Sequence, residues 1–382
     1  MATKNRGVIV ATAQTVVDAV ETELDQISDT VIEQVGLVDR MGERQASALD
    51  MTWLRKYRMW REWVGERETR SDRRAFQSRM YSRKFEDSIR IPIEDIEDGI
   101  EANFDPQGEA AGLREGYENL VEQEHQAFFE HAMDEDFVGG TVTGPHGEQI
   151  YVGSLDGEPL LSDSHPYYEQ IEYRPNAAPG QRLNLTQGGE FSNLVDEAFS
   201  DDALWNARKS FQKLVDFRGR PANFGQPDTL IVPPDLEREA MQVLERATKV
   251  EDSDGGAGAG AVENETQGIV DIFVDPYLVG TVDATFEYGG TTYTDKTIDL
   301  SQVFFLVNST AQLSPFVMWD RKDLELQTPV GTPGLDEANP AEGDVSHTVF
   351  MHDAMIMGAR ARFGMSFGMP QVMYGSLGGQ LA

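Results

Sequence analysis

The chain has 382 residues, of which 66 are acidic and 32 are basic, and its formal net charge is -34. A content of 40% hydrophobic and 9% aromatic residues indicates a folded globular protein rather than a disordered one. The absence of Cys excludes disulfides, thiolate metal sites and Cys nucleophiles. No apolar run reaches membrane-spanning length and the N-terminus has no secretion pattern, so we expect a protein made in a cytoplasm that interacts with no membrane.

The charge balance also predicts the kind of solvent in which the protein works. Self-repulsion opposes a compact acidic fold in dilute buffer, whereas molar salt shortens the Debye length to about 3 Å and removes most of that penalty. Lys occurs at only eight positions, so Arg carries most of the positive charge. This acid-rich, Lys-poor composition favours a halophilic source, and an ordinary acidic cytosolic protein is the alternative.

The first predicted element is a helix over residues 13–35, which Gly36 ends. Its apolar residues recur at alternating spacings of three and four, the pattern of a helix with one narrow apolar side: Val17, Val20, Leu24, Ile27 and Val31. An aromatic stripe with the same spacing predicts a second helix before Gly65, formed by Trp53, Tyr57, Trp60 and Trp63.

Positive charge is concentrated between Trp53 and Arg90, where twelve basic and six acidic residues give a net +6 and leave the rest of the chain at -40. Three interpretations fit: a nucleic-acid patch, a segment lying on the acidic surface of a neighbouring copy, or a solvated helix face with local ion pairs. Residues 76–93 are predicted to be extended, with Pro92 restricting the strand to a sheet edge. The stretch therefore predicts a helix followed by a projecting hairpin that needs a partner to cover it.

The remaining elements predict one mixed α+β unit. A long helix is expected from Pro106 to about Met133, with Asp105 as its N-cap and one apolar face. Two shorter helices are expected at 200–215 and 236–247. Strands are expected at 228–232, 269–274, 284–288, 292–300, 302–308 and 316–320, and acidic loops at 251–268 and 331–344.

Catalytic and metal-binding patterns are weak in this sequence. His125 and His131, six residues apart, fall on different helix faces, and we expect His165 to make a structural hydrogen bond in a turn. Ser210 and Lys213 have the spacing of one class of serine nucleophile without its companion motifs. We therefore predict no enzyme, no catalytic residue, no cofactor and no specific metal site, and we leave weak cation binding at carboxylates between copies open.

Five segments, in order from about residue 60 to the C-terminus, indicate a family: EWVGERE, KFEDSIRIPIEDIEDG, LDGEPLLSDSHP, GRPANFGQPDTLIVPPDLEREAMQVL and GARARFGMSFGMPQ. Together they resemble the major head subunit of Mu-like tailed phages, a branch of the Hong Kong 97-like capsid proteins. With the composition, the resemblance implies a virus of halophilic archaea. Leu161 departs from the family, which usually has Phe there, and residues 1–50 match nothing.

The resemblance implies an α+β fold of the Hong Kong 97-like type. Its function would be that of a structural major capsid protein, which self-assembles into hexamers and pentamers of an icosahedral head around double-stranded DNA. It would be assembled in the host cytoplasm and reside in the virion capsid. The implied parts are an N-terminal arm at 1–65, an E-loop at 66–96, a peripheral domain at 97–190 with a spine helix at 106–133, an axial domain at 190–310, and a return to the peripheral domain with C-terminal strands at 311–382.

The partners implied by the resemblance are other copies of the chain, packaged DNA held without sequence specificity, and decoration, portal and scaffold proteins. A basic arm then has a reason to exist, because the surface on which it lies is another acidic copy. The candidate intersubunit contacts are Arg67, Arg70, Arg73, Arg74, Arg79, Arg83, Lys84 and Arg90. The alternative functions are a soluble halophilic enzyme or a surface-layer protein with no recognisable catalytic motif.

Overall fold

The structure is a computed structural model of the whole chain, in which helices and strands form a mixed fold. The residues that it describes are 18, 22–23, 26–42, 48–54, 74–92, 106–138, 142–143, 149–150, 152–173, 183–216, 219, 225–246, 248–250, 261–264, 266–311, 313–327 and 354–381. None of the helices within these residues is long and apolar enough to cross a membrane.

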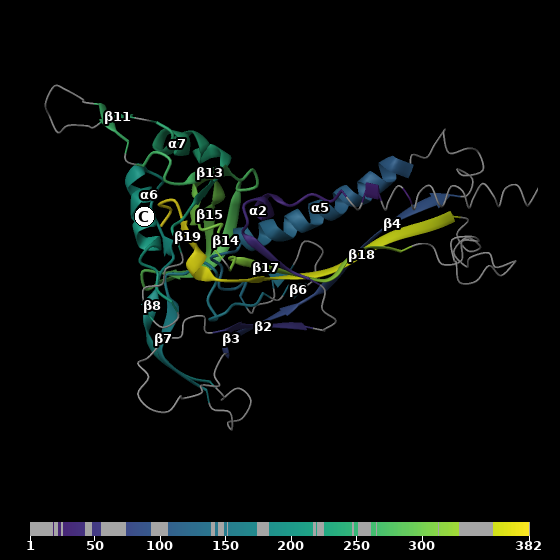
Figure 1. Ribbon diagram of the computed structural model, residues 1–382, viewed down its shortest axis with the longest axis horizontal. Helices are drawn as coiled ribbons and strands as arrows, with labels where there is room; N and C mark the ends of the chain where they lie inside the picture. Colours follow the sequence, from purple (N-terminus) through teal and green to yellow (C-terminus); the bar gives the residue numbers. More distant parts are fainter. Residues whose placement is uncertain are drawn as a thin grey trace, which may run out of the picture.

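A long four-stranded sheet forms one arm of the molecule (Figure 1). Its strands, in spatial order, are β1 (Val38–Met41), β17 (Phe316–Gln327), β18 (Ala354–Phe367) and β4 (Arg83–Pro92). β1 runs parallel to β17, and the other two pairs are antiparallel. β4 is an edge strand ending at Pro92, which confirms the edge position predicted from that proline.

A five-stranded sheet forms the other part of the body. Its spatial order is β13 (Asp271–Val274), β10 (Thr229–Val232), β16 (Phe304–Val307), β19 (Met373–Ser376) and β9 (Leu194–Val195). Every residue of β16 is buried, because the strand separates two cores. Phe305 and Val307 face the core under the long helix, whereas Phe304 and Leu306 face the core of α6 (Asp201–Phe211) and α7 (Pro234–Leu244).

The long helix α5 (Pro106–Glu130) lies along the four-stranded sheet (Figure 1). Its buried residues Val121, Phe128 and Phe129 join the core, and the Phe129 ring lies edge-on to Phe305 with 4.7 Å between centroids. Aromatic pairs in this geometry add stability beyond the burial of their area. The prediction of a long helix beginning at Pro106 is confirmed, but the helix ends at Glu130, because residues 131–133 form a turn in which the His131 ring contacts Asp134.

Five two-stranded ribbons and two short 3₁₀ helices complete the fold. The ribbons are β2 (Ala48–Leu54) with β3 (Arg74–Tyr81), β5 (Val142–Thr143) with β6 (Gln149–Ile150), β7 (His165–Tyr173) with β8 (Leu183–Phe191), β11 (Thr248–Val250) with β12 (Ala261–Glu263), and β14 (Thr281–Tyr288) with β15 (Thr291–Asp299). The 3₁₀ helices are η1 (Leu300–Gln302) and η2 (Pro370–Val372).

The predicted helix over residues 13–35 is wrong as one continuous element. Residues 27–30 are not helical, and a separate short helix, α2 (Val31–Gln34), begins after Thr30. Thr30 and Glu33 form a capping box, in which each side chain accepts a backbone N–H of the other residue. Gly36 ends this helix with a positive φ of 77°, as predicted.

The N-terminal segment is held by polar contacts with α5 in addition to the burial of Ile32 and Leu37 in the core. The Ser28 hydroxyl and backbone N–H donate to Glu118, and the Val31 N–H donates to Glu122 over 3.1 Å. The Thr30 hydroxyl lies 2.7 Å from Nδ1 of the buried His125. These partners lie about ninety residues away in sequence, which is why helical spacing alone mispredicts the segment.

Three further expectations differ from the structure. Trp53 lies in β2, opposite Phe76, so the helix predicted through the aromatic stripe does not begin there; the rest of that stripe lies outside the described residues. Residues 76–92 are extended as predicted, but β3 and β4 pair with β2 and β18 instead of with each other. Ala261–Glu263, expected in a loop, pair with β11, whereas the loop at 331–344 lies outside the described residues.

The predicted structural role of His165 is confirmed. Its ring nitrogens lie 2.9 Å from Asp156 Oδ2 and 3.1 Å from Asn193 Oδ1, and its side chain is fully buried. Asn193 in turn donates to the carbonyls of Leu160, Pro370 and Met373. This buried network links the turn at 154–165 to the C-terminal part of the chain. Each polar group in it would be costly to leave without a partner, so the link stabilises the fold.

The docked N-terminal segment predicts a specific pH dependence. Burial lowers the pKa of His125 from 6.5 to about 4, with Glu33 opposing and Arg40 adding to the shift. Below pH 6.5 the unfolded chain takes up a proton that the folded chain does not, so stability falls as the pH drops towards 4. We expect His125 to contribute a loss of about 2 kcal/mol in unfolding free energy between pH 7.5 and 5.

Urea unfolding in molar NaCl at these two pH values measures that loss. His125→Gln should remove it, and His131→Gln, a change at a partly exposed histidine, should retain it. An identical pH dependence in the wild type and His125→Gln would contradict the assignment.

Candidate intersubunit surface

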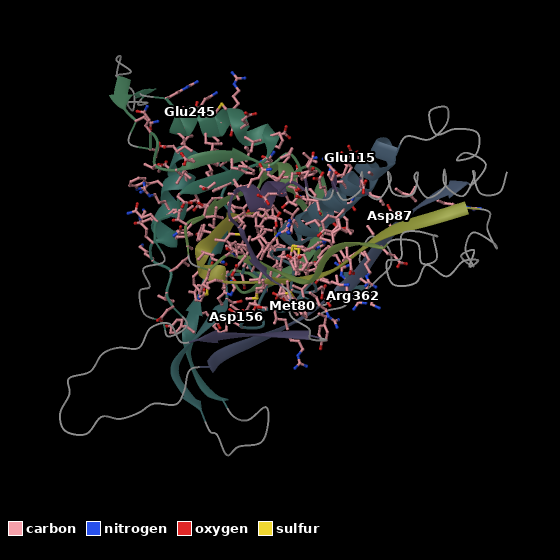
Figure 2. All side chains as sticks on the ribbon, turned by 45° about the vertical axis from the view of Figure 1, so that its right-hand side comes forward. Met80, Asp87, Glu115, Asp156, Glu245 and Arg362 are labelled. Atoms are coloured by element: carbon pink, nitrogen blue, oxygen red, sulfur yellow. The ribbon has the colours of Figure 1, made fainter. Side chains whose placement is uncertain are left out.

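The four-stranded sheet has two chemically different faces near its β4 edge. The strand register places Arg83 and Phe85 on the face that α5 covers, and Lys84 and Glu86 on the opposite face. Figure 2 shows the ribbon of β4 and β18 with Asp87 and Arg362 labelled on it and with Glu115 on the neighbouring helix. We call the face away from α5 the outer face.

The face towards α5 is closed by aromatic stacking and one ion pair. Phe85 stacks on Phe363 with 4.5 Å between centroids, and Tyr117 of α5 meets Phe363 edge-on at 6.4 Å. Arg83 pairs with the almost fully buried Glu124 of α5 and lies 5.1 Å from the Phe85 ring centroid. A partly buried pair of this kind depends on both partners, because loss of Arg83 would leave a carboxylate in an apolar setting.

The outer face carries two rows of charge that cross three strands. In one row Arg362 of β18 lies opposite Lys84 of β4 and Lys322 of β17, so three cations are direct neighbours. Like charges in this position destabilise a sheet. Within the part of the chain that the structure describes, neither Lys84 nor Arg362 has an ion-pair partner, whereas Lys322 pairs with Glu325.

The second row alternates in sign. Arg360 of β18 lies between Glu86 of β4 and Glu325 of β17, and it donates to Glu325 Oε2 from Nε over 3.1 Å and from Nη2 over 2.9 Å. Hydrogen bonds from Lys322 and Arg360 hold the pKa of Glu325 below its usual value. A register shift of β17 between Lys322 and Glu325 brings both side chains to the outer face.

The β2–β3 hairpin is anchored on this same outer face, beside the first row. Leu49 and Met80 pack on the completely buried Val317 and Trp319 of β17. The Tyr81 carbonyl crosses β18 so closely that a Cβ at Gly364 would lie 2.3 Å from its oxygen. In Figure 1 the hairpin and α5 lie on opposite sides of the long sheet. The hairpin therefore leaves the body at Tyr81, where the chain continues directly into β4.

The eight predicted contact residues lie in different parts of the chain. Arg67, Arg70 and Arg73 lie outside the described residues, and Arg74 begins β3. Arg79 of β3 and Arg90 of β4 are exposed. Lys84 lies on the outer face. Arg83 instead pairs with Glu124 of α5 in its own chain, so any contact of Arg83 with another subunit would have to exist alongside this ion pair. The intersubunit role of these residues stays a prediction.

Three cations of the outer face, namely Lys322, Arg360 and Arg362, were not predicted as site residues. The sequence analysis followed charge density along the chain, and these residues are dispersed among apolar and acidic neighbours. The alternation in GARARFG is the available signal, because residues 360 and 362 must share one face of a strand. Their proximity to Lys84 depends on strand pairing, which the sequence alone does not show.

In the described ranges, no group of three or more His, Asp or Glu side chains is arranged to hold a metal ion. His347, His352 and most of the predicted acidic loop at 251–268 lie outside those ranges. The surface consists of paired strands, a hairpin anchored at its root and two rows of charge.

Comparison with known families identifies the class of protein to which the chain belongs. A family profile described as phage capsid protein matches residues 172–367, which is about half of the chain, and the chain belongs to that family. A second profile, described as the Mu-like prophage major head subunit gpT, matches residues 16–130, so the expectation that residues 1–50 match nothing is wrong for residues 16–50. The protein is thus a major capsid protein, the structural subunit of an icosahedral phage shell, and enclosure of DNA is implied by that role.

Solved capsid structures resemble the chain at low identity. They include the procapsid of bacteriophage JBD30, with 14% identity over 96% of this chain and 75% of that chain and a TM-score of 0.39. The capsid of cyanophage P-SCSP1u has 9% identity over 91% and 88%, with a TM-score of 0.46. A virus-like particle from Pyrococcus furiosus has 11% identity over 94% and 96%, with a TM-score of 0.38. No curated protein sequence matches the chain.

The close crossing at Gly364 predicts a steric requirement for glycine. Gly364→Ala would force the Tyr81 backbone away from β18, and overpacking of this kind typically destabilises a protein by about 1–3 kcal/mol. We expect a lower unfolding free energy in urea and faster proteolysis at the root of the hairpin. Gly112→Ala, in α5 where a Cβ would meet nothing within 4 Å, should be neutral or stabilising. Equal stability of the two variants would contradict the anchoring contact.

Proposed function

We propose that the β2–β3 hairpin and the residues 55–73 that connect it form the E-loop of a Hong Kong 97-like capsid subunit, and that this loop lies on a neighbouring copy. The observation that carries the proposal is the way the hairpin is held. Among the hairpin side chains that the structure describes, Leu49 and Met80 pack on the body at its root, where the Tyr81 carbonyl also crosses β18. A two-stranded ribbon is marginal in water on its own, so contact with a second copy supplies what is missing.

The proposal moves the E-loop from the predicted 66–96 to 48–81. β4 pairs with β18 along its whole length from Arg83 to Pro92, which makes it part of the body. The other parts would follow the family arrangement, with α5 as the spine helix of the peripheral domain and the five-stranded sheet with α6 and α7 as the axial domain. Axial domains would meet at the centres of hexamers and pentamers, and the closed shell would hold double-stranded DNA.

The source that we propose is a virus of halophilic archaea. A net charge of -34 with eight Lys residues supports it, because molar salt screens the repulsion between such subunits. Ion pairs at short range and partly out of water, such as Arg83 with Glu124, are screened far less. Assembly in the host cytoplasm, with portal, scaffold and decoration proteins as further partners, belongs to the same proposal.

Charge reversal in the hairpin tests the proposed E-loop. Simultaneous replacement of Arg73, Arg74 and Arg79 by Glu should block shell assembly, because the arm would then repel the acidic surface of the neighbouring copy. Replacement of the same three residues by Lys keeps the charge and should retain assembly. Sedimentation and electron microscopy of the purified variants in molar NaCl measure the outcome. Normal shells from the Glu variant would overturn the proposed role of the hairpin.

A further inference from the structure

Among the described residues, the cation row on the outer face is only partly neutralised by its own chain. The two rows together contain four cations, Lys84, Lys322, Arg360 and Arg362, and two carboxylates, Glu86 and Glu325. Glu325 already accepts hydrogen bonds from both Lys322 and Arg360. The face therefore keeps a net +2 in a chain whose total is -34. In a sequence so rich in acid, three adjacent cations of which only Lys322 has a carboxylate partner among the described residues indicate an external anionic partner.

Arg362, at the centre of the row, also has a hydrogen-bond donor without a partner among the described residues. Its Nε is buried and has no hydrogen-bond partner in the structure. Buried donors of this kind are normally paired, and one left unpaired is destabilising. Its guanidinium is flanked on both sides by ammonium groups, from Lys84 on β4 and Lys322 on β17. A carboxylate approaching the row from outside would meet a planar guanidinium fork between two point charges.

We propose that the row formed by Lys84, Arg362 and Lys322 binds carboxylate side chains of a second copy of this chain. The occupant is a second copy because the chain forms shells and because almost any surface that a copy presents is acidic. The row also adjoins the anchored root of the hairpin, since Arg321, next to Lys322, donates to Ser82 over 3.3 Å. One copy would therefore be contacted by both features of the outer face. The inference rests on shell assembly and is independent of the role proposed for the hairpin.

Reversal of the central charge is the decisive test. Arg362→Glu should reduce the yield of shells from purified, nucleic-acid-free protein in molar NaCl by about tenfold, because a carboxylate would then face the carboxylates of the neighbouring copy. Lys296→Glu, which makes a charge reversal of the same sign on β15 away from the row, should assemble like the wild type. A near-ultraviolet circular dichroism spectrum like that of the wild type, to which the buried Trp319 contributes, establishes that the Arg362 variant is folded. Arg362→Gln, which removes the charge without reversing it, should be intermediate.

Three results of this comparison are informative. Normal assembly of both Arg362→Glu and Lys296→Glu would overturn the inference while leaving the shell and the hairpin proposal intact. Normal empty shells of Arg362→Glu that hold less DNA would assign the row to phosphate and would also overturn it. An absence of shells from the wild type itself would count against the assembly on which the inference rests, and not against the row in particular.

Chemical cross-linking gives a second readout that does not require a variant. Carbodiimide joins a Lys amine to a carboxylate in direct contact, so shells assembled from equal amounts of ¹⁴N and ¹⁵N subunits should give cross-linked peptides of mixed label that contain Lys84 or Lys322. Lys296 serves as the comparison within the same digest. Lys322 also contacts Glu325 of its own chain, so single-label cross-links of Lys322 are expected in addition. Cross-links of Lys84 that carry only one label would place its carboxylate partner in the same chain and would contradict the inference.

Discussion

The constraint on which this structure depends is that an acidic chain must pack against identical acidic copies of itself. A shell brings many copies together, each with a net charge of -34, so the few cations have to be placed where chains meet or where a buried carboxylate needs them. The structure shows the second use, and we propose the first for the outer face. Arg83 neutralises Glu124 inside the chain, whereas Lys84, the next residue, lies on the outer face in a row of cations. Successive side chains of β4 point to opposite faces of the sheet, which separates the two roles.

The long sheet supplies the scaffold for that separation. On β17, Phe316 and Met318 belong to the core under α5, and Val317 and Trp319 hold the root of the hairpin on the opposite side. Both faces of the strand are therefore used, and Gly364 on β18 allows the chain to cross without displacing the backbone. The hairpin is fixed at its base on rigid strands, as expected for an arm that has to reach a defined position on another subunit.

Local sequence signals predicted the elements whose boundaries depend on local chemistry. Ser200 caps α6 as predicted, and the strand from Thr229 to Val232 lies within the predicted range, whereas α7 begins at Pro234, before the predicted start at 236. Elements fixed by distant partners were mispredicted. The helical spacing of Trp53 with the later aromatic residues was a misleading signal, because pairing with Phe76 decides its conformation. The break at Thr30 depends on His125, ninety-five residues away. The cation row depends on the register of three strands, and charge density along the chain could indicate only Lys84.

The measurement that tests the central claim most directly is electron microscopy of the purified protein after sedimentation in molar NaCl, and again after dilution. The account predicts closed shells, or rings of five and six subunits, in molar salt, and their dissociation into small species when the salt no longer screens the repulsion between acidic copies. A uniform small species under both conditions would contradict it.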